Sequence, residues 1–207
     1  MKAIQIVEES LIWTEVDTPE PKKGEVLIKI LATAINRADL AQRSGNYPPP
    51  DGESDILGLE CSGEIVKVGE GIDEERIGEN VCALLAGGGY AEYVCCPSIQ
   101  AIKVPSNLSI IESASLPEVF ATCWLNLFIE GDLYKGQNIL LHAGASGIGT
   151  AAIQLCNSFG ANSFVTVGNE EKLKKFKDSI SEKIYPIILS EKYSKLDTNL
   201  IIDNTDN

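Results

Sequence analysis

A glycine-rich segment at residues 142–149, with the sequence HAGASGIG, constrains the fold of this chain more than any other feature. The apolar run 138–143 leads into it and predicts a short buried strand. In residues 148–159 apolar side chains recur at three- and four-residue spacing, and Gly160 follows at the position of a C-cap, so a helix is predicted. A second strand is predicted at 163–167. Strand, turn, helix and strand form a βαβ unit, which implies a parallel sheet with helices on its faces.

The same segment predicts a function. Glycines let the backbone turn sharply and let a pyrophosphate approach the N–H groups at a helix N-terminus, where the helix dipole favours anions. The spacing is GxxGxG rather than the commoner GxGxxG, and such a loop alone is a weak signal. The strand before it and the helix after it favour dinucleotide binding. The alternative is a tight turn that only needs small residues.

The end of the second strand discriminates between the two nicotinamide dinucleotides. An acidic residue about 20 positions past the loop usually binds the ribose hydroxyls of NAD. Counting from Gly149 reaches Asn169, so the carboxylate is missing, and Lys172 lies within reach of a 2′-phosphate. Glu170 and Glu171 in the same turn would repel a phosphate if they pointed inward. The pattern favours NADPH over NADH, the alternative being that the lysine belongs to a solvated helix face.

The two halves of the chain differ in their predicted secondary structure. The first half is β-rich, with proline and glycine turns between short runs, and is typical of a small barrel or sandwich. Its predicted strands are 2–7, 11–16, 25–35, 61–68, 81–85 and 90–96. The second half adds predicted helices at 112–130 and 170–183 and predicted strands at 183–189 and 199–203. Together with the βαβ unit these make about half of a doubly wound nucleotide-binding sheet.

Composition excludes several classes of function. With 17 basic and 30 acidic residues the formal charge is −13, which argues against nucleic-acid binding, because that binding depends on neutralising phosphates. The six cysteines include no CxxC pair, so we expect reduced, mostly buried thiols rather than a zinc knuckle or a disulfide scaffold. The N-terminus lacks the apolar stretch of a signal peptide. The longest apolar run, 119–129, is shorter than the roughly 20 residues that cross a bilayer. We therefore expect a cytoplasmic protein without a membrane span.

Four segments together resemble a known family. They are residues 36–50 (NRADLAQRSGNYPPP), 56–60 (ILGLE), 116–118 (LPE) with Thr122, and the loop 142–149. The chain resembles the zinc-independent quinone oxidoreductase branch of the medium-chain dehydrogenase/reductase superfamily, and within it most closely the p53-inducible quinone oxidoreductase subgroup. This resemblance implies an α/β fold with a GroES-like β-rich domain at 1–112 and an incomplete Rossmann domain at 113–207.

The resemblance also bears on metal and substrate. Zinc-dependent alcohol dehydrogenases of this superfamily have a cysteine at the position of Asn36 and a histidine at that of Leu59. An amide and a leucine cannot replace these zinc ligands, so we expect no catalytic zinc. The implied activity is direct hydride transfer from NADPH to a quinone or an enone, a small-molecule substrate that needs no metal.

The resemblance assigns the site residues. Asn36 and Thr122 would lie against the nicotinamide, and Tyr47 beside the quinone ring. The pyrophosphate would be held by Ser146, Gly147, Ile148 and Gly149, and the 2′-phosphate surrounded by Gly168, Asn169 and Lys172.

Each of the three catalytic candidates also has a purely structural interpretation. Asn36 could cap a turn, Tyr47 could pack beside prolines, and Thr122 could be an ordinary helix hydroxyl. His142, the one histidine of the chain, is expected to pack or hydrogen-bond locally rather than to act as a base.

The resemblance thins after Lys172, and members of the family are longer. We therefore expect a truncated reductase with weak NADPH affinity that lacks the homodimer interface of the family. The alternative is a catalytically inactive remnant that retains only weak nucleotide or partner binding.

Overall fold

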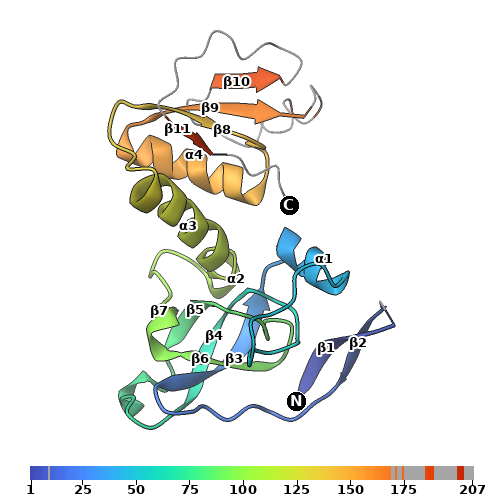
Figure 1. The fold of residues 1–207 in the computed structure, drawn as a ribbon. Helices are drawn as coiled ribbons and strands as arrows, with labels where there is room; N and C mark the ends of the chain where they lie inside the picture. Colours follow the sequence, from blue (N-terminus) through green and yellow to red (C-terminus); the bar gives the residue numbers. More distant parts are fainter. Residues whose placement is uncertain (9, 169–170, 172–173, 175–184, 189–199, 203–207) are drawn as a thin grey trace. The chain divides into compact units, whose positions relative to one another are not determined.

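The computed structural model describes residues 1–8, 10–168, 171, 174, 185–188 and 200–202. Contacts between Cα atoms divide the chain into two compact units, Met1–Glu118 and Val119–Asn207 (Figure 1).

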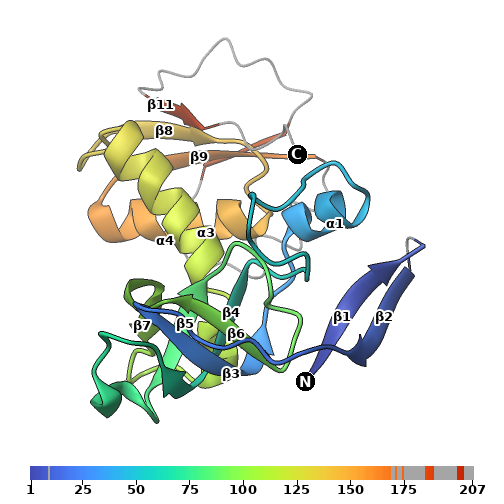
Figure 2. The same cartoon turned by 60° about the horizontal axis from the view of Figure 1, so that its bottom comes forward.

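The first unit is built on an antiparallel sheet of five strands in the order β6-β3-β4-β5-β7, and the sheet curls on itself (Figure 2). Two register shifts within the β3·β4 pairing bend it. Its inner face buries alternate side chains such as Ile28, Ile65 and Val81. The strands are β3 (Glu25–Thr33), β4 (Glu60–Val68), β5 (Asn80–Leu84), β6 (Tyr93–Pro97) and β7 (Ala101–Lys103), with a separate hairpin of β1 (Lys2–Val7) and β2 (Ser10–Glu15).

Short helices connect or follow these strands. The first, α1 (Arg37–Arg43), follows β3, and α2 (Ile110–Ser113) begins at the Ser109 cap, whose hydroxyl accepts the Glu112 N–H. Two single turns of 3-10 helix are η1 (Glu74–Arg76) and η2 (Ser98–Gln100).

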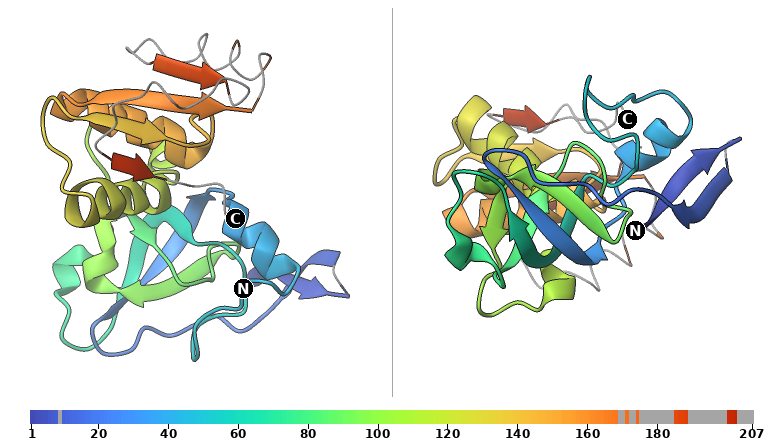
Figure 3. Two further views of the ribbon diagram at one scale, coloured as in Figure 1. Left: turned by 45° about the horizontal axis from the view of Figure 1, so that its top comes forward. Right: turned by 90° about the horizontal axis from the view of Figure 1, so that it is seen from below.

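The second unit contains a parallel sheet in the order β10-β9-β8-β11 (Figure 3). In chain order this is 3-2-1-4, the first part of the doubly wound sheet, so the α/β fold prediction is confirmed. Its core joins the strands to α4 through residues such as Ile139, Ile153 and Val165. The elements are β8 (Asn138–Leu141), α4 (Gly147–Phe159), β9 (Asn162–Val167), β10 (Tyr185–Ile188) and β11 (Leu200–Ile202).

Two predictions of secondary structure need correction. The single helix expected at 112–130 is instead α2, then α3 (Pro117–Trp124), then a π-helical segment, Leu125–Glu130. Pro117 cannot donate a backbone hydrogen bond, so it starts a new helix rather than continuing α2. Helix α1 was missed because its seven residues are shorter than a recognisable apolar period. Most of the helix predicted at 170–183 lies outside the described residues.

The cysteines are free thiols, as expected. Five of the six are buried, and Cys95 is half-buried. Burial raises the pKa of Cys96 and of Cys156 to about 12, so both stay protonated at neutral pH.

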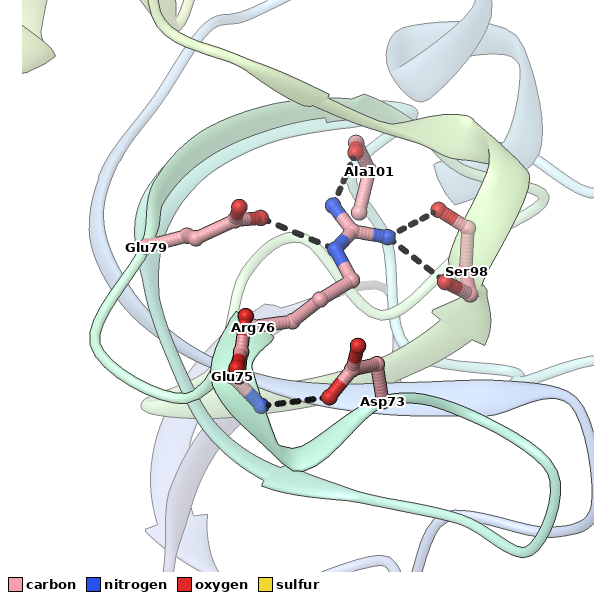
Figure 4. A network of polar contacts seen from close by, with 6 residues as sticks. All are labelled: Asp73, Glu75, Arg76, Glu79, Ser98 and Ala101. Atoms are coloured by element: carbon pink, nitrogen blue, oxygen red, sulfur yellow. Dashed lines mark hydrogen bonds and ion pairs between the residues drawn. The ribbon is translucent and has the colours of Figure 1, made fainter.

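The guanidinium of Arg76 links η1 to η2 and to the start of β7 (Figure 4). Its Nε donates to Glu79 Oε2 at 2.8 Å. Its Nη1 donates to the carbonyl oxygen of Ser98 at 2.8 Å and to its hydroxyl at 2.6 Å, and its Nη2 to the Ala101 carbonyl at 2.8 Å. One planar side chain therefore satisfies acceptors on three segments.

We expect Arg76→Ala to lower the free energy of unfolding by about 2 kcal/mol, because it leaves partly buried acceptors without a donor. Urea unfolding followed by circular dichroism measures the change. Lys103→Ala, which removes the same charge from an exposed position on β7, is the control. Equal effects of the two substitutions would contradict the account.

Candidate functional site

The glycine turn after β8 is held against β9. Ala143 has a positive φ of 52°, and its N–H donates to Thr166 Oγ1 at 3.2 Å. The Gly144 N–H donates to the Thr166 carbonyl at 2.9 Å. A Cβ at Gly144 would lie 2.6 Å from Val165 Cβ, so only glycine allows this approach. The turn is therefore fixed in shape by the second strand of the βαβ unit.

The turn leads into helix α4, and only some of the N–H groups at the N-terminus of this helix have hydrogen-bond acceptors. Ser146 is the N-cap, and its Oγ accepts the Gly149 N–H at 3.0 Å. Its carbonyl accepts the Thr150 N–H at 2.9 Å. Among the described residues no acceptor takes the N–H of Gly147 or Ile148. Two unpaired donors at the positive end of a helix dipole are what an anion requires.

Helix α3 packs on the start of α4. The Cys123 thiol donates to the Ile148 carbonyl at 3.3 Å, and a Cβ at Gly147 would lie 3.4 Å from Val119 Cγ1. Thr122 is half-buried and follows Val119 by three residues, so both lie on one face of the helix. Val119, on the same face of α3 as Thr122, is therefore the residue of this helix that lies next to Gly147.

The other predicted nicotinamide residue lies in the first unit. Asn36 is the N-cap of α1, and its N–H donates to Asp39 Oδ2 at 2.7 Å. The structural interpretation of Asn36 as a cap is therefore seen. Its side chain makes a further contact, since Nδ2 donates to Glu60 Oε1 at 2.8 Å.

Asn36 thus donates to two buried carboxylates, those of Glu60 at 1% and Asp39 at 2% exposure. Glu60 Oε2 accepts the Glu118 N–H at 3.0 Å, and Asp39 Oδ2 also accepts the Tyr90 hydroxyl at 2.8 Å. Asp39 Oδ1 is buried without a partner among the described residues. Burial raises the pKa of Glu60, and the charge of Asp39 adds to this, against two hydrogen bonds that lower it. Burial and Asp39 likewise raise the pKa of Tyr90.

This shift makes stability depend on pH. The pKa of Glu60 in the folded protein lies above its ordinary value of 4.5. The contribution of this side chain to the free energy of unfolding is therefore complete below pH 4.5 and is lost as the pH rises through the pKa of the folded state. We expect the unfolding free energy of the wild type, relative to Glu60→Gln, to fall as the pH rises above 4.5. Urea unfolding at several pH values tests this, with Glu64→Gln on the exposed face of β4 controlling for net charge. A constant difference would contradict it.

The remaining predicted residues are less informative. Tyr47 is 49% exposed, and Gly45 and Pro48, which stand near it in the sequence, line a groove. Gly168 directly follows β9, and a Cβ placed there would meet no atom within 4 Å, while Asn169 and Lys172 lie outside the described residues. The ring of His142 hydrogen-bonds locally, with Nδ1 3.1 Å from Thr166 Oγ1.

Sequence reasoning missed the two carboxylates and Tyr90 as parts of the site. Glu60 offered a signal, because a charged residue stands there directly before a run of buried strand residues. In the part of the chain that the structure describes, no three His, Cys, Asp or Glu side chains gather to hold a metal ion. Nor does any helix within those residues have the length and apolar character needed to cross a membrane.

Known proteins share this architecture. Residues 22–106 match the alcohol dehydrogenase GroES-like domain family. The human synaptic vesicle membrane protein VAT-1 homolog-like is 32% identical over 163 residues, which are 79% of this chain and 39% of that protein. Its crystal structure superposes with a TM-score of 0.80 at 30% identity, covering 91% of this chain and 61% of the other.

Two further solved structures are similar. The mycobacterial protein Rv1454c, complexed with NADPH, has a TM-score of 0.78 at 30% identity and covers 91% of this chain and 58% of its own. The CurK enoyl reductase has a TM-score of 0.78 at 27% identity, with coverages of 89% and 59%. The chain therefore spans less than two thirds of each of these relatives.

A curled GroES-like sheet followed by a βαβ unit with a glycine turn defines a two-part, dehydrogenase-type architecture. With the relatives above, it places the chain in the medium-chain dehydrogenase/reductase superfamily.

Proposed function

We propose that this chain contributes to an NADPH-dependent reduction of quinones or enones that uses no zinc, in the manner of the quinone oxidoreductase branch. The observation that carries the proposal is the start of α4, where the N–H groups of Gly147 and Ile148 have no acceptor among the described residues and Ser146 caps the N–H of Gly149. A diphosphate fits such a place, because it meets backbone donors and no side chain at Gly147.

The choice of cofactor and substrate has separate support. The relative Rv1454c was solved with NADPH, and strand β9 ends at Val167 and is followed in the sequence by Gly168 and Asn169, neither of which carries a carboxylate. CurK is an enoyl reductase, which favours the enone as an alternative to the quinone. Asn36 and Leu59 stand where zinc-dependent relatives have ligands, and neither side chain suits that metal.

The chain's residues would then bind and orient rather than perform acid–base chemistry. Ser146, Gly147, Ile148 and Gly149 would form the diphosphate turn, and Asn36 and Thr122 would position the nicotinamide. Tyr47 would lie beside the substrate ring and hydrogen-bond a carbonyl oxygen. When bound, NADPH supplies a hydride, and the acceptor takes one proton from water to give hydroquinone or saturated ketone and NADP⁺.

Loss of NADPH absorbance in the presence of naphthoquinone, or of an α,β-unsaturated ketone, tests the activity. We expect turnover that is faster with NADPH than with NADH and that persists after dialysis against a chelator. Purified protein that contains stoichiometric zinc, or that oxidises no NADPH with either substrate at saturating NADPH, would overturn the proposal. Saturable NADPH binding without turnover would instead support the inactive remnant.

A further inference from the structure

Glu60 is an unusual residue for a strand whose first four residues are buried. Its carboxylate accepts one hydrogen bond at each oxygen, from the side chain of Asn36 at 2.8 Å and from the backbone of Glu118 at 3.0 Å. These partners are 24 residues before it and 58 residues after it in the chain. A buried carboxylate with both oxygens occupied holds its partners in defined places.

The first partner is the side-chain amide of Asn36. An amide can turn over and exchange its donor and acceptor ends, but a carboxylate accepts only, so it selects the orientation with Nδ2 toward Glu60. The backbone of Asn36 is fixed as well, because Asp39 Oδ2 accepts its N–H and is itself held by the Tyr90 hydroxyl. A ligand at Asn36 therefore always meets the same remaining donor and acceptor.

The second partner is the first turn of α3. Glu118 follows Pro117 at the N-terminus of this helix, where N–H groups have no partner within the helix. A carboxylate at this end also interacts favourably with the helix dipole. Glu60 thus anchors the start of the helix that carries Thr122.

We propose that Glu60 is a positioning residue for the nicotinamide, holding the amide of Asn36 in one orientation and fixing the start of α3. This inference rests on the proposed function, because the proposed function assigns Asn36 and Thr122 to the nicotinamide ring. Glu60 acts through these residues and does not itself react.

Glu60→Gln tests the inference, because it keeps the shape but offers one acceptor and one NH₂ group to two N–H donors. If the oxygen of the new glutamine side chain accepts the Glu118 N–H, its NH₂ group faces the NH₂ group of Asn36. This donor–donor contact is relieved when the Asn36 amide turns over and presents its oxygen. We expect the side-chain ¹⁵N–¹H resonances of Asn36, assigned by their loss in Asn36→Asp, to shift in Glu60→Gln and not in Glu64→Gln. In turnover we expect kcat to fall at least tenfold with an unchanged KM for the substrate.

The double variant Glu60→Gln with Asn36→Asp separates positioning from stability. It restores a hydrogen bond with its direction reversed, so we expect the melting temperature to recover while the rate does not. If the melting temperature and the rate both recovered, the role of Glu60 would be structural only, and the inference would be overturned. So would unchanged Asn36 resonances and rate in Glu60→Gln. Failure of the proposed function looks different, because the wild type itself would then show no turnover.

Discussion

Alanine at Gly149 will strongly destabilise the protein, whereas alanine at Gly147, two residues earlier in the same helix, will not. A Cβ at Gly149 would lie 2.6 Å from the Ala143 carbonyl oxygen and from two backbone atoms of Gly144. Backbone atoms that β9 already holds cannot move aside cheaply, so the helix must shift. Overpacking of this kind costs about 1–3 kcal/mol.

Gly147 provides the matched control. A Cβ there would meet only Val119 Cγ1 at 3.4 Å, an ordinary contact. Alanine also has the higher helix propensity, so Gly147→Ala should be neutral or slightly stabilising. Chemical unfolding of the two variants measures the contrast. Equal free energies of unfolding for the two variants would contradict the close approach of the turn backbone to Gly149.

Aspartate at Gly147 is expected to weaken NADPH binding at least 100-fold, or by about 2.8 kcal/mol. The new carboxylate would lie next to the unpaired N–H groups of Gly147 and Ile148 and repel the diphosphate. The same negative charge at a helix N-terminus favours the helix, so the melting temperature should stay level or rise. Loss of binding together with retained stability separates repulsion at the site from misfolding.

Gly147→Asn is the control for this substitution, because it has nearly the same size without the charge. We expect its NADPH affinity to lie between those of the wild type and Gly147→Asp, and the difference from Gly147→Asp to shrink as salt is added. Titrations followed by tryptophan fluorescence measure all three proteins. Equal affinities for the Asn and Asp variants would show that no phosphate lies at this turn.

The turn and its βαβ unit were predictable from sequence because their determinants are local. Glycine spacing, an apolar strand and a helical period all lie within residues 138–167, and the structure places β8, α4 and β9 there. The helix was predicted to begin at Ile148, and the structure begins it one residue earlier, at Gly147, with Ser146 as its N-cap.

The carboxylate network around Asn36 was not predictable in this way. Its hydrogen bonds join Asn36 to Glu60 and Tyr90 to Asp39, across 24 and 51 residues of chain. Such pairings depend on how the sheet curls, and no local period encodes them. Sequence reasoning could select Asn36 through its family motif but not the residues that hold it.

The most direct test of the central claim is to record ¹⁵N–¹H spectra of the wild-type chain during titration with NADPH. If the diphosphate binds at the turn, the backbone amides of Gly147 and Ile148 will show the largest shifts, and inorganic pyrophosphate will shift the same two signals. Saturation with NADPH that leaves both amides unmoved would contradict the account.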